Sequence, residues 1–207
     1  MPSQSKLLSI TTWLLGLLTL VAMATQLTIH LRLNFSLVNF FSYFTNLANL
    51  LAALVLIATA SLRLASRELS PALESARAVS AVNMAVVGIV FSVLLRNVDL
   101  GSLQPWVNVL LHYVMPVAVM LEWLLRPPRT RFTARHVGLC LVIPLVYLAY
   151  VLVRGAAISW YPYPFLNPAH AGGYGGVALY VAGIALVFWL VACLLLIVPK
   201  RRQVRNH

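Results

Sequence analysis

The chain has 207 residues, of which 61% are hydrophobic and only 9% are charged. A soluble protein has about 25% charged residues to keep its surface hydrated. A mean hydropathy of +0.90 therefore excludes an ordinary soluble domain and indicates that lipid surrounds most of the chain. A net charge of +11 is also typical of nucleic-acid binding, but the positions of the charges have a simpler explanation in membrane topology.

Six stretches are long and apolar enough to be transmembrane helices, because one span needs about 20 mostly apolar residues. They lie at about residues 7–27, 43–62, 78–98, 106–125, 136–154 and 174–198. Pro144 falls inside the fifth stretch, where neighbouring helices can satisfy the carbonyl that it frees. The sequence thus predicts an all-α integral membrane protein, a six-helix bundle that forms a single domain over residues 1–207.

The basic residues fall mainly on one side of the predicted membrane. All Lys and Arg residues except Arg32, Arg96 and Arg154 lie before the first span, after the sixth, or in the segments 63–77 and 126–135. We interpret these two segments as polar cytoplasmic connectors. The positive-inside rule then puts both chain ends in the cytoplasm. Nucleic acid is therefore not expected as a partner.

One alternative topology remains open at the first span. A basic start, an apolar run and the small-residue pattern Ala22-Met23-Ala24 resemble a signal-peptidase site. Cleavage there would leave five spans and an N-terminus outside the cytoplasm.

Cysteine and histidine spacing indicates neither a disulfide framework nor a metal site. Cys140 and Cys193 both fall within predicted spans, where a reduced, packed pair of thiols is expected. We expect no metal and no cofactor.

Polar side chains gather near the outer ends of the predicted spans. The second span begins with Thr45 and Asn46, and Asn49 follows Thr45 on the same helix face. The fourth span carries Asn108 and His112 on one face. Gln26 and Arg96, at the outer ends of the first and third spans, are predicted at a similar depth. Polar groups in the hydrocarbon are costly, so this cluster is a candidate functional site.

Two interpretations of Thr45 and His112 follow from the residues alone. Interhelical hydrogen bonds between polar side chains are common in membrane proteins and contribute about 0.6 kcal/mol each. Alternatively, His112 removes the hydroxyl proton of Thr45 as Thr45 attacks an ester carbonyl. Asn46, Asn49 or Asn108 would then orient the histidine or stabilise the oxyanion.

The last outer loop is rich in aromatic and turn-forming residues, including Tyr163 and Phe165. The simple interpretation is an aromatic belt at headgroup depth. The prolines and paired glycines of the same loop instead favour a lid over a pocket. Tyr163 and Phe165 are therefore candidate substrate-binding residues.

Glu122 is the single carboxylate within a predicted span. It lies too far along the helix from His112 to complete a catalytic triad directly. Its position four residues before Arg126 predicts an ion pair between those two side chains.

The sequence resembles the androgen-induced-protein family of transmembrane threonine hydrolases in three patches, and it looks like a compact bacterial branch of that family. Phe41-Ser42-Tyr43-Phe44-Thr45-Asn46-Leu47 resembles the threonine-bearing helix. His112, followed by Pro116 and Glu122, resembles the catalytic-histidine helix, with the proline displaced by one residue. Tyr163-Pro164-Phe165-Leu166 resembles a tetrapeptide of the last outer loop.

The resemblance implies hydrolysis of lipid esters, in particular fatty acid esters of hydroxy fatty acids. It implies Thr45 as the nucleophile, His112 as its base and a bacterial cytoplasmic (inner) membrane as the location. A transporter or channel for small molecules or lipids is the alternative, although the middle of the predicted spans is nearly all apolar. A non-catalytic membrane scaffold is a further alternative.

Overall fold

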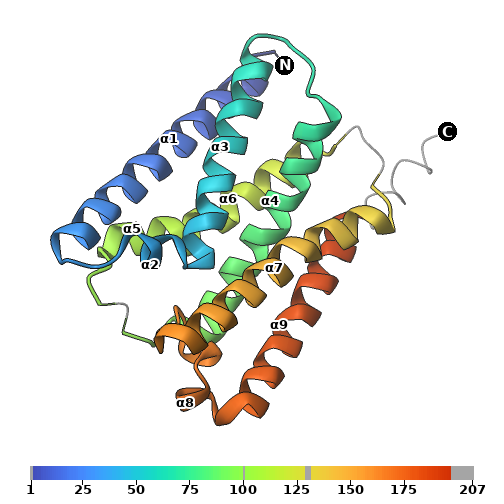
Figure 1. The fold of residues 1–207 in the computed structure, drawn as a ribbon. Coiled ribbons are helices and arrows are strands. Elements are labelled where there is room, and N and C mark those ends of the chain that lie inside the picture. The colour runs from blue at the N-terminus through green and yellow to red at the C-terminus, as the bar shows by residue number, and fades with distance from the viewer. Residues whose placement is uncertain (1, 100, 129–131, 197–207) are drawn as a thin grey trace.

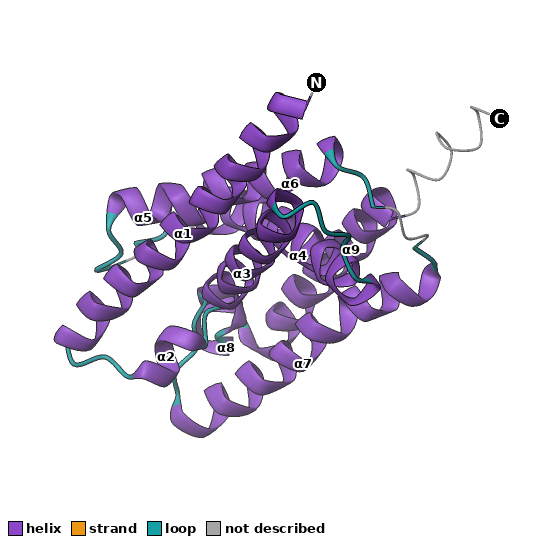
Figure 2. Cartoon of the chain, turned by 90° about the horizontal axis from the view of Figure 1, so that it is seen from above, coloured by secondary structure: helices purple, strands orange, loops and turns teal. Residues whose placement is uncertain are grey.

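The computed structural model describes residues 2–99, 101–128 and 132–196, and these residues form helices without any strand (Figure 2). Six helical segments are long and apolar enough to cross a membrane. The six are α1 (Pro2–Arg32), α3 (Phe44–Leu64), α4 (Pro71–Val90) continued by η1 (Phe91–Leu95), α5 (Pro105–Val109) continued by η2 (Leu110–Val114) and α6 (Met115–Leu125), α7 (Ala134–Ile158), and α9 (Gly173–Leu196). The predicted all-α architecture and its six apolar segments are confirmed.

Three short elements lie at the end of the bundle where α3 begins, which we call the Thr45 end. They are α2 (Leu37–Phe41), the 3₁₀ turn η3 (Pro164–Leu166) and α8 (Pro168–Ala171). Figure 1 shows α2 and α8 together at this end of the molecule. We call the opposite end, where α3 finishes, the Arg63 end.

Helix α4 occupies the middle of the bundle and packs against α3, α6, α7 and α9. Its side chains Ala81, Val82 and Met84 are fully buried. Figures 1 and 2 show α1 and α3 side by side on one side of α4, and α7 with α9 on the other. Many large apolar side chains of α1, α7 and α9 face outward, as expected for helices in contact with lipid.

Helices α1 and α3 approach closely because a glycine lies between them. A Cβ atom at Gly16 would lie 2.7 Å from Cγ1 of Ile57 and 2.9 Å from the carbonyl oxygen of Ala53. Trp13 adds a hydrogen bond from Nε1 to the hydroxyl of Ser61 at 3.2 Å. Small residues allow such close packing in membrane helices, where burial of apolar surface gives little driving force.

The third helical segment begins earlier than its hydropathy predicted. The Ser70 hydroxyl accepts a hydrogen bond from the backbone N–H of Leu73, and Pro71 occupies the first turn. Both features favour a helix start. Arg77 therefore lies inside α4 and is only 2% exposed, so its assignment to a polar connector was wrong.

The charge of Arg77 is neutralised within the bundle. Its guanidinium donates to Glu74 at 2.6 Å and to both carboxylate oxygens of Glu122 at 3.0 and 3.1 Å. Arg63 also donates to Glu122, at 2.5 Å. These contacts join α3, α4 and α6 at the Arg63 end.

The predicted ion pair between Glu122 and Arg126 is replaced by this interhelical network. Arg126 instead donates to the carbonyl oxygen of Ser5 at 2.6 Å and to the hydroxyl of Ser9 at 3.0 Å, which joins α6 to α1. Spacing along one helix predicted the wrong partner because arginines of two other helices point at the same carboxylate. Several basic residues of the predicted cytoplasmic segments lie outside the described residues: Arg129, Arg131, Lys200, Arg201, Arg202 and Arg205.

Candidate functional site

Thr45 is the second residue of α3, and its side chain is buried. The first N–H groups of a helix have no acceptor within the helix, so they need another partner. The N–H of Thr45 donates to the hydroxyl oxygen of Tyr163 at 3.2 Å. The Thr45 Oγ1 atom lies 3.4 Å from the same oxygen. The hydroxyl of Thr45 is thus held at a helix N-terminus, beside a phenol.

Tyr163 is brought to Thr45 by the loop that follows α7. Ser159 ends α7 in a left-handed conformation, with a φ of 55°. The ring of Tyr161 then packs directly on Gly155, where a Cβ atom would lie 2.1 Å from Cε1 of that ring. Gly155 therefore allows the loop to fold back closely over α7.

The phenol of Tyr163 is itself buried and packed. Its ring stacks on Phe165 with centroids 5.1 Å apart and an interplanar angle of 5°. Burial raises the pKa of Tyr163 above its usual value of 10.0, so the phenol keeps its proton at neutral pH and can donate it in a hydrogen bond.

His112 lies in the π-helical segment η2 and is buried. Its Nδ1 atom lies 3.2 Å from the carbonyl oxygen of Asn108. A carbonyl only accepts hydrogen bonds, so this contact favours the neutral tautomer with the proton on Nδ1. The Nε2 atom has no hydrogen-bond partner among the described residues and carries the free lone pair.

A stacked aromatic ring holds His112 from the side. Phe91 stacks on the imidazole with centroids 3.9 Å apart and an interplanar angle of 22°. Phe91 belongs to the other π-helical segment, η1, so two such segments meet at this histidine. Short π-helical insertions are rare and occur often at functional sites.

Thr45 and His112 both line a cavity of about 460 Å³ at the Thr45 end, which we call the polar cavity. Its other polar side chains come from α1, α2, α3, α8 and the loops after η1 and α7. They are Gln26, His30, Asn39, Asn46, Asp99, Ser102, Asn167 and His170. The two candidate catalytic side chains are not hydrogen-bonded to each other in the structure.

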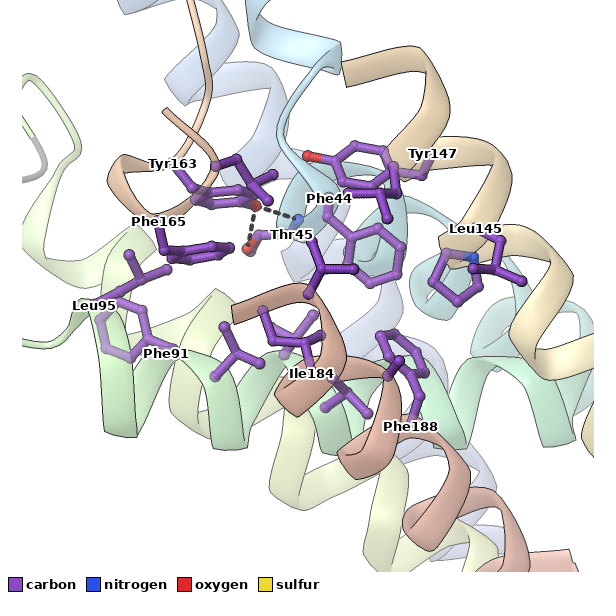
Figure 3. Close-up of a pocket in the computed structure, with 18 of the residues that line it drawn as sticks. Phe44, Thr45, Phe91, Leu95, Leu145, Tyr147, Tyr163, Phe165, Ile184 and Phe188 are labelled. Carbon is purple, nitrogen blue, oxygen red and sulfur yellow. Dashed lines mark hydrogen bonds between the residues drawn. The ribbon is translucent and has the colours of Figure 1, made fainter. Parts of the chain in front are cut away.

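A second cavity, of about 180 Å³, begins at Thr45 and extends between α7 and α9. We call it the apolar cavity, because nearly all its walls are hydrocarbon (Figure 3). Ile184 and Phe188 of α9 and Leu145 of α7 form part of its wall, and Thr45 and Tyr163 also line it. Four residues line both cavities: Thr45, Phe91, Leu95 and Tyr163.

The three asparagines predicted for the site differ in whether they line a cavity. Asn49 donates through Nδ2 to the carbonyl oxygens of Thr45 at 2.9 Å and Leu111 at 3.2 Å, so it joins α3 to η2. Asn46 lines the polar cavity and donates to the carbonyl oxygen of Phe40 at 2.7 Å. Asn108 contributes its backbone carbonyl to His112, and its side chain lines neither cavity.

Gln26 is buried as part of the polar cluster, whereas Arg96 is not. Gln26 is buried and bridges the loop after η1, donating to Ser102 O at 3.1 Å and accepting from Gln104 N–H at 3.0 Å. Arg96 follows the end of η1, is exposed and lines neither cavity. Its predicted place in the polar cluster was wrong, because Phe91 and Leu95 form the buried face of this helical segment and Arg96 lies outside that face.

Several residues of the site were not predicted. Phe91 gave no signal in the sequence, since an aromatic residue in an apolar helix is ordinary. Tyr147 of α7 lines the apolar cavity and donates to the carbonyl oxygen of Ser42 at 2.9 Å. His30 and His170 were not among the predicted site residues, yet both line the polar cavity.

No group of His, Cys, Asp or Glu among the described residues has the arrangement of a metal site. Cys140 and Cys193 are both free thiols. The sequence matches no protein-family model, and neither curated proteins nor solved structures show a match to it. Any assignment of function must therefore rest on the chemistry of the two cavities and of the residues between them.

Proposed function

We propose that this protein is a membrane-embedded threonine hydrolase that cleaves lipid esters. The observation that carries the proposal is that Thr45 and His112, from separate helices, line one cavity at the point where an apolar cavity begins. Fatty acid esters of hydroxy fatty acids belong to this substrate class. The charge asymmetry of the sequence supports an orientation with the Thr45 end in the outer third of a bacterial cytoplasmic membrane.

His112 is the proposed general base. A histidine whose Nδ1–H is held by a carbonyl presents an unprotonated Nε2, which is the form that accepts a proton. Catalytic hydrogen bonds are often long in ligand-free enzymes and shorten when substrate binds. The absence of a direct Thr45–His112 hydrogen bond is therefore compatible with this role.

Tyr163 is the proposed oxyanion donor. Its oxygen accepts the N–H of Thr45 and lies 3.4 Å from Oγ1, so in the proposed reaction its O–H donates to the oxygen that develops negative charge beside Thr45. The N-terminus of α3 adds a partial positive charge at the same place.

The proposed reaction has two steps. In the first, the Thr45 proton moves to Nε2 of His112, Oγ1 forms a bond to the ester carbonyl carbon, and the bond to the alcohol oxygen breaks as that oxygen takes the proton from Nε2. In the second, His112 removes a proton from water, whose oxygen bonds to the same carbon. The Thr45–acyl bond then breaks as Oγ1 takes this proton back from Nε2, which releases the acid and restores the hydroxyl.

A fluorophosphonate probe tests this proposal, because it phosphonylates activated hydroxyl groups with loss of fluoride. The purified protein in detergent should be labelled at Thr45, Thr45→Ala should lose the label, and Thr45→Ser should keep it. Thr59→Ala is the matched control, since Thr59 is a buried threonine near the other end of α3. Equal labelling of wild type and Thr45→Ala overturns the proposal, and solute flux in liposomes that survives Thr45→Ala would point to a transporter.

A further inference from the structure

The two cavities that meet at Thr45 differ in chemistry, and the proposed reaction splits an ester into two halves there. An acyl group bound to Thr45 can extend into the apolar cavity, whose wall is formed by residues such as Leu145, Ile184 and Phe188. Burial of each methylene group there contributes about 0.8 kcal/mol. The fatty acyl half of the ester fits this cavity.

His112 lines only the polar cavity. A general acid must reach the oxygen of the leaving alcohol, so the alcohol half has to lie on the His112 side of Thr45. Water for the second step can enter the same cavity. The positions of the two catalytic side chains therefore orient the substrate, with its acyl half toward α7 and α9 and its alcohol half toward His112.

The groups around the polar cavity favour an uncharged alcohol. Asn46, Asn167 and Ser102 supply hydrogen-bonding groups, whereas no Lys or Arg lines this cavity among the described residues. Asp99 is its one carboxylate there and would repel an anionic leaving group. The nearby Arg154 is occupied, since it donates to Asn39 at 2.6 Å and lies over the ring of Trp160.

We infer that the substrate is a fatty acid ester of a small, uncharged, hydroxyl-rich alcohol such as glycerol. The acyl chain lies between α7 and α9, and the alcohol lies in the polar cavity beside His112. This inference rests on the proposed function and narrows it, because an ester of a hydroxy fatty acid would put a carboxylate in the cavity that Asp99 lines.

Competing esters of one acid test this inference. Purified protein in detergent is given decanoyl glycerol and the decanoyl ester of a hydroxystearic acid, and fluorophosphonate labelling of Thr45 is followed in parallel. We expect kcat/KM for the glycerol ester to be about tenfold higher or more, the size of effect that a few mismatched contacts produce. Labelling of Thr45 with equal or faster cleavage of the hydroxystearate ester overturns the inference and leaves the proposed function intact. Absence of labelling overturns both.

A pair of tryptophan variants on α9 tests the place of the acyl chain. Ile184 lines the apolar cavity, whereas Leu186 is 55% exposed on the same helix. Ile184→Trp should lower kcat/KM for decanoyl glycerol at least about tenfold more than kcat/KM for acetyl glycerol, because only the longer chain needs the filled space. Leu186→Trp should change neither. An equal loss for both esters in Ile184→Trp, or no loss for either, overturns the assignment of the acyl chain to this cavity.

Discussion

The side-chain amide of Asn49 donates a hydrogen bond to the backbone carbonyl of Leu111 at 3.2 Å. The same amide donates to the carbonyl of Thr45 at 2.9 Å. Leu111 directly precedes His112, so one fully buried side chain joins the backbones that carry the two proposed catalytic residues. Asn49 is thus a positioning residue for the site.

Replacement of this amide should separate catalysis from substrate binding. We expect Asn49→Leu to lower kcat for ester hydrolysis by about 10- to 100-fold with little change in KM, because small displacements of catalytic groups are costly. Asn83→Leu is the matched control, since Asn83 is also a buried asparagine, on α4, and lines neither cavity. Similar kcat values for the two variants would contradict the positioning role of Asn49.

Removal of the Tyr163 hydroxyl should slow the chemical step. Loss of one oxyanion donor lowers kcat by about 10²- to 10³-fold in enzymes of this type, and we expect Tyr163→Phe to fall in that range with KM nearly unchanged. Tyr180→Phe is the control, because the ring of Tyr180 packs on Phe165 with centroids 5.9 Å apart but lines neither cavity. A loss of the same size in Tyr180→Phe would indicate a packing effect.

The pH profile gives a second measurement on Tyr163. Burial raises the pKa of its phenol above 10.0, and the proton is lost only as the pH rises through that higher value. The hydrolysis rate of the wild type should therefore show no decline from phenol ionisation below pH 10. A decline in the wild-type hydrolysis rate below pH 10 that is absent in Tyr163→Phe would contradict the raised pKa of Tyr163.

The charged network at the Arg63 end should contribute to stability and not to catalysis. Glu122→Gln leaves Arg77 with Glu74 as its remaining carboxylate partner. Breaking a buried ion pair costs about 3–5 kcal/mol, and we expect the low end of that range because one partner stays. The midpoint of thermal unfolding in detergent measures the effect. Arg67→Gln, at an exposed position, should change stability by less than about 0.5 kcal/mol.

Two glycines of α7 offer a matched pair for testing the loop that carries Tyr163. Gly155→Ala should displace this loop, since the new methyl group would overlap the ring of Tyr161, and hydrolysis should fall about tenfold or more as Tyr163 moves. A Cβ at Gly138 has no atom within 4 Å, so Gly138→Ala should preserve activity. It should also add up to about 1 kcal/mol of helix stability. Full activity in Gly155→Ala would show that the loop tolerates the shift.

Hydropathy was sufficient to predict the six helical segments, because each one must present a long apolar surface. The positions of Thr45 and His112 along their helices were sufficient to predict that the two residues lie at a similar depth. The partners of Glu122 could not be predicted in the same way, because they depend on how α4 and α6 are rotated about their axes. Hydrophobic side chains alone specify such rotations poorly.

The π-helical segments were also beyond prediction from the sequence. Both η1 and η2 consist mainly of apolar residues that fit an ordinary α-helix equally well. The contact that joins these two segments is between Phe91 and His112, which are far apart in the chain. Arg96 was placed wrongly for a related reason, since depth along a helix does not fix which face of the helix is buried.

The charged and polar contacts at the Arg63 end join α1, α3, α4 and α6, whereas α7 and α9 form the outer wall of the apolar cavity. Thr45 and His112 both belong to the first group of helices. The nucleophile and its base are therefore encoded apart from the α7 and α9 wall that faces the acyl chain. Directed evolution restricted to residues 141–148 and 181–188 should then change the acyl-chain length that the protein accepts, while the nucleophile and its base stay unchanged.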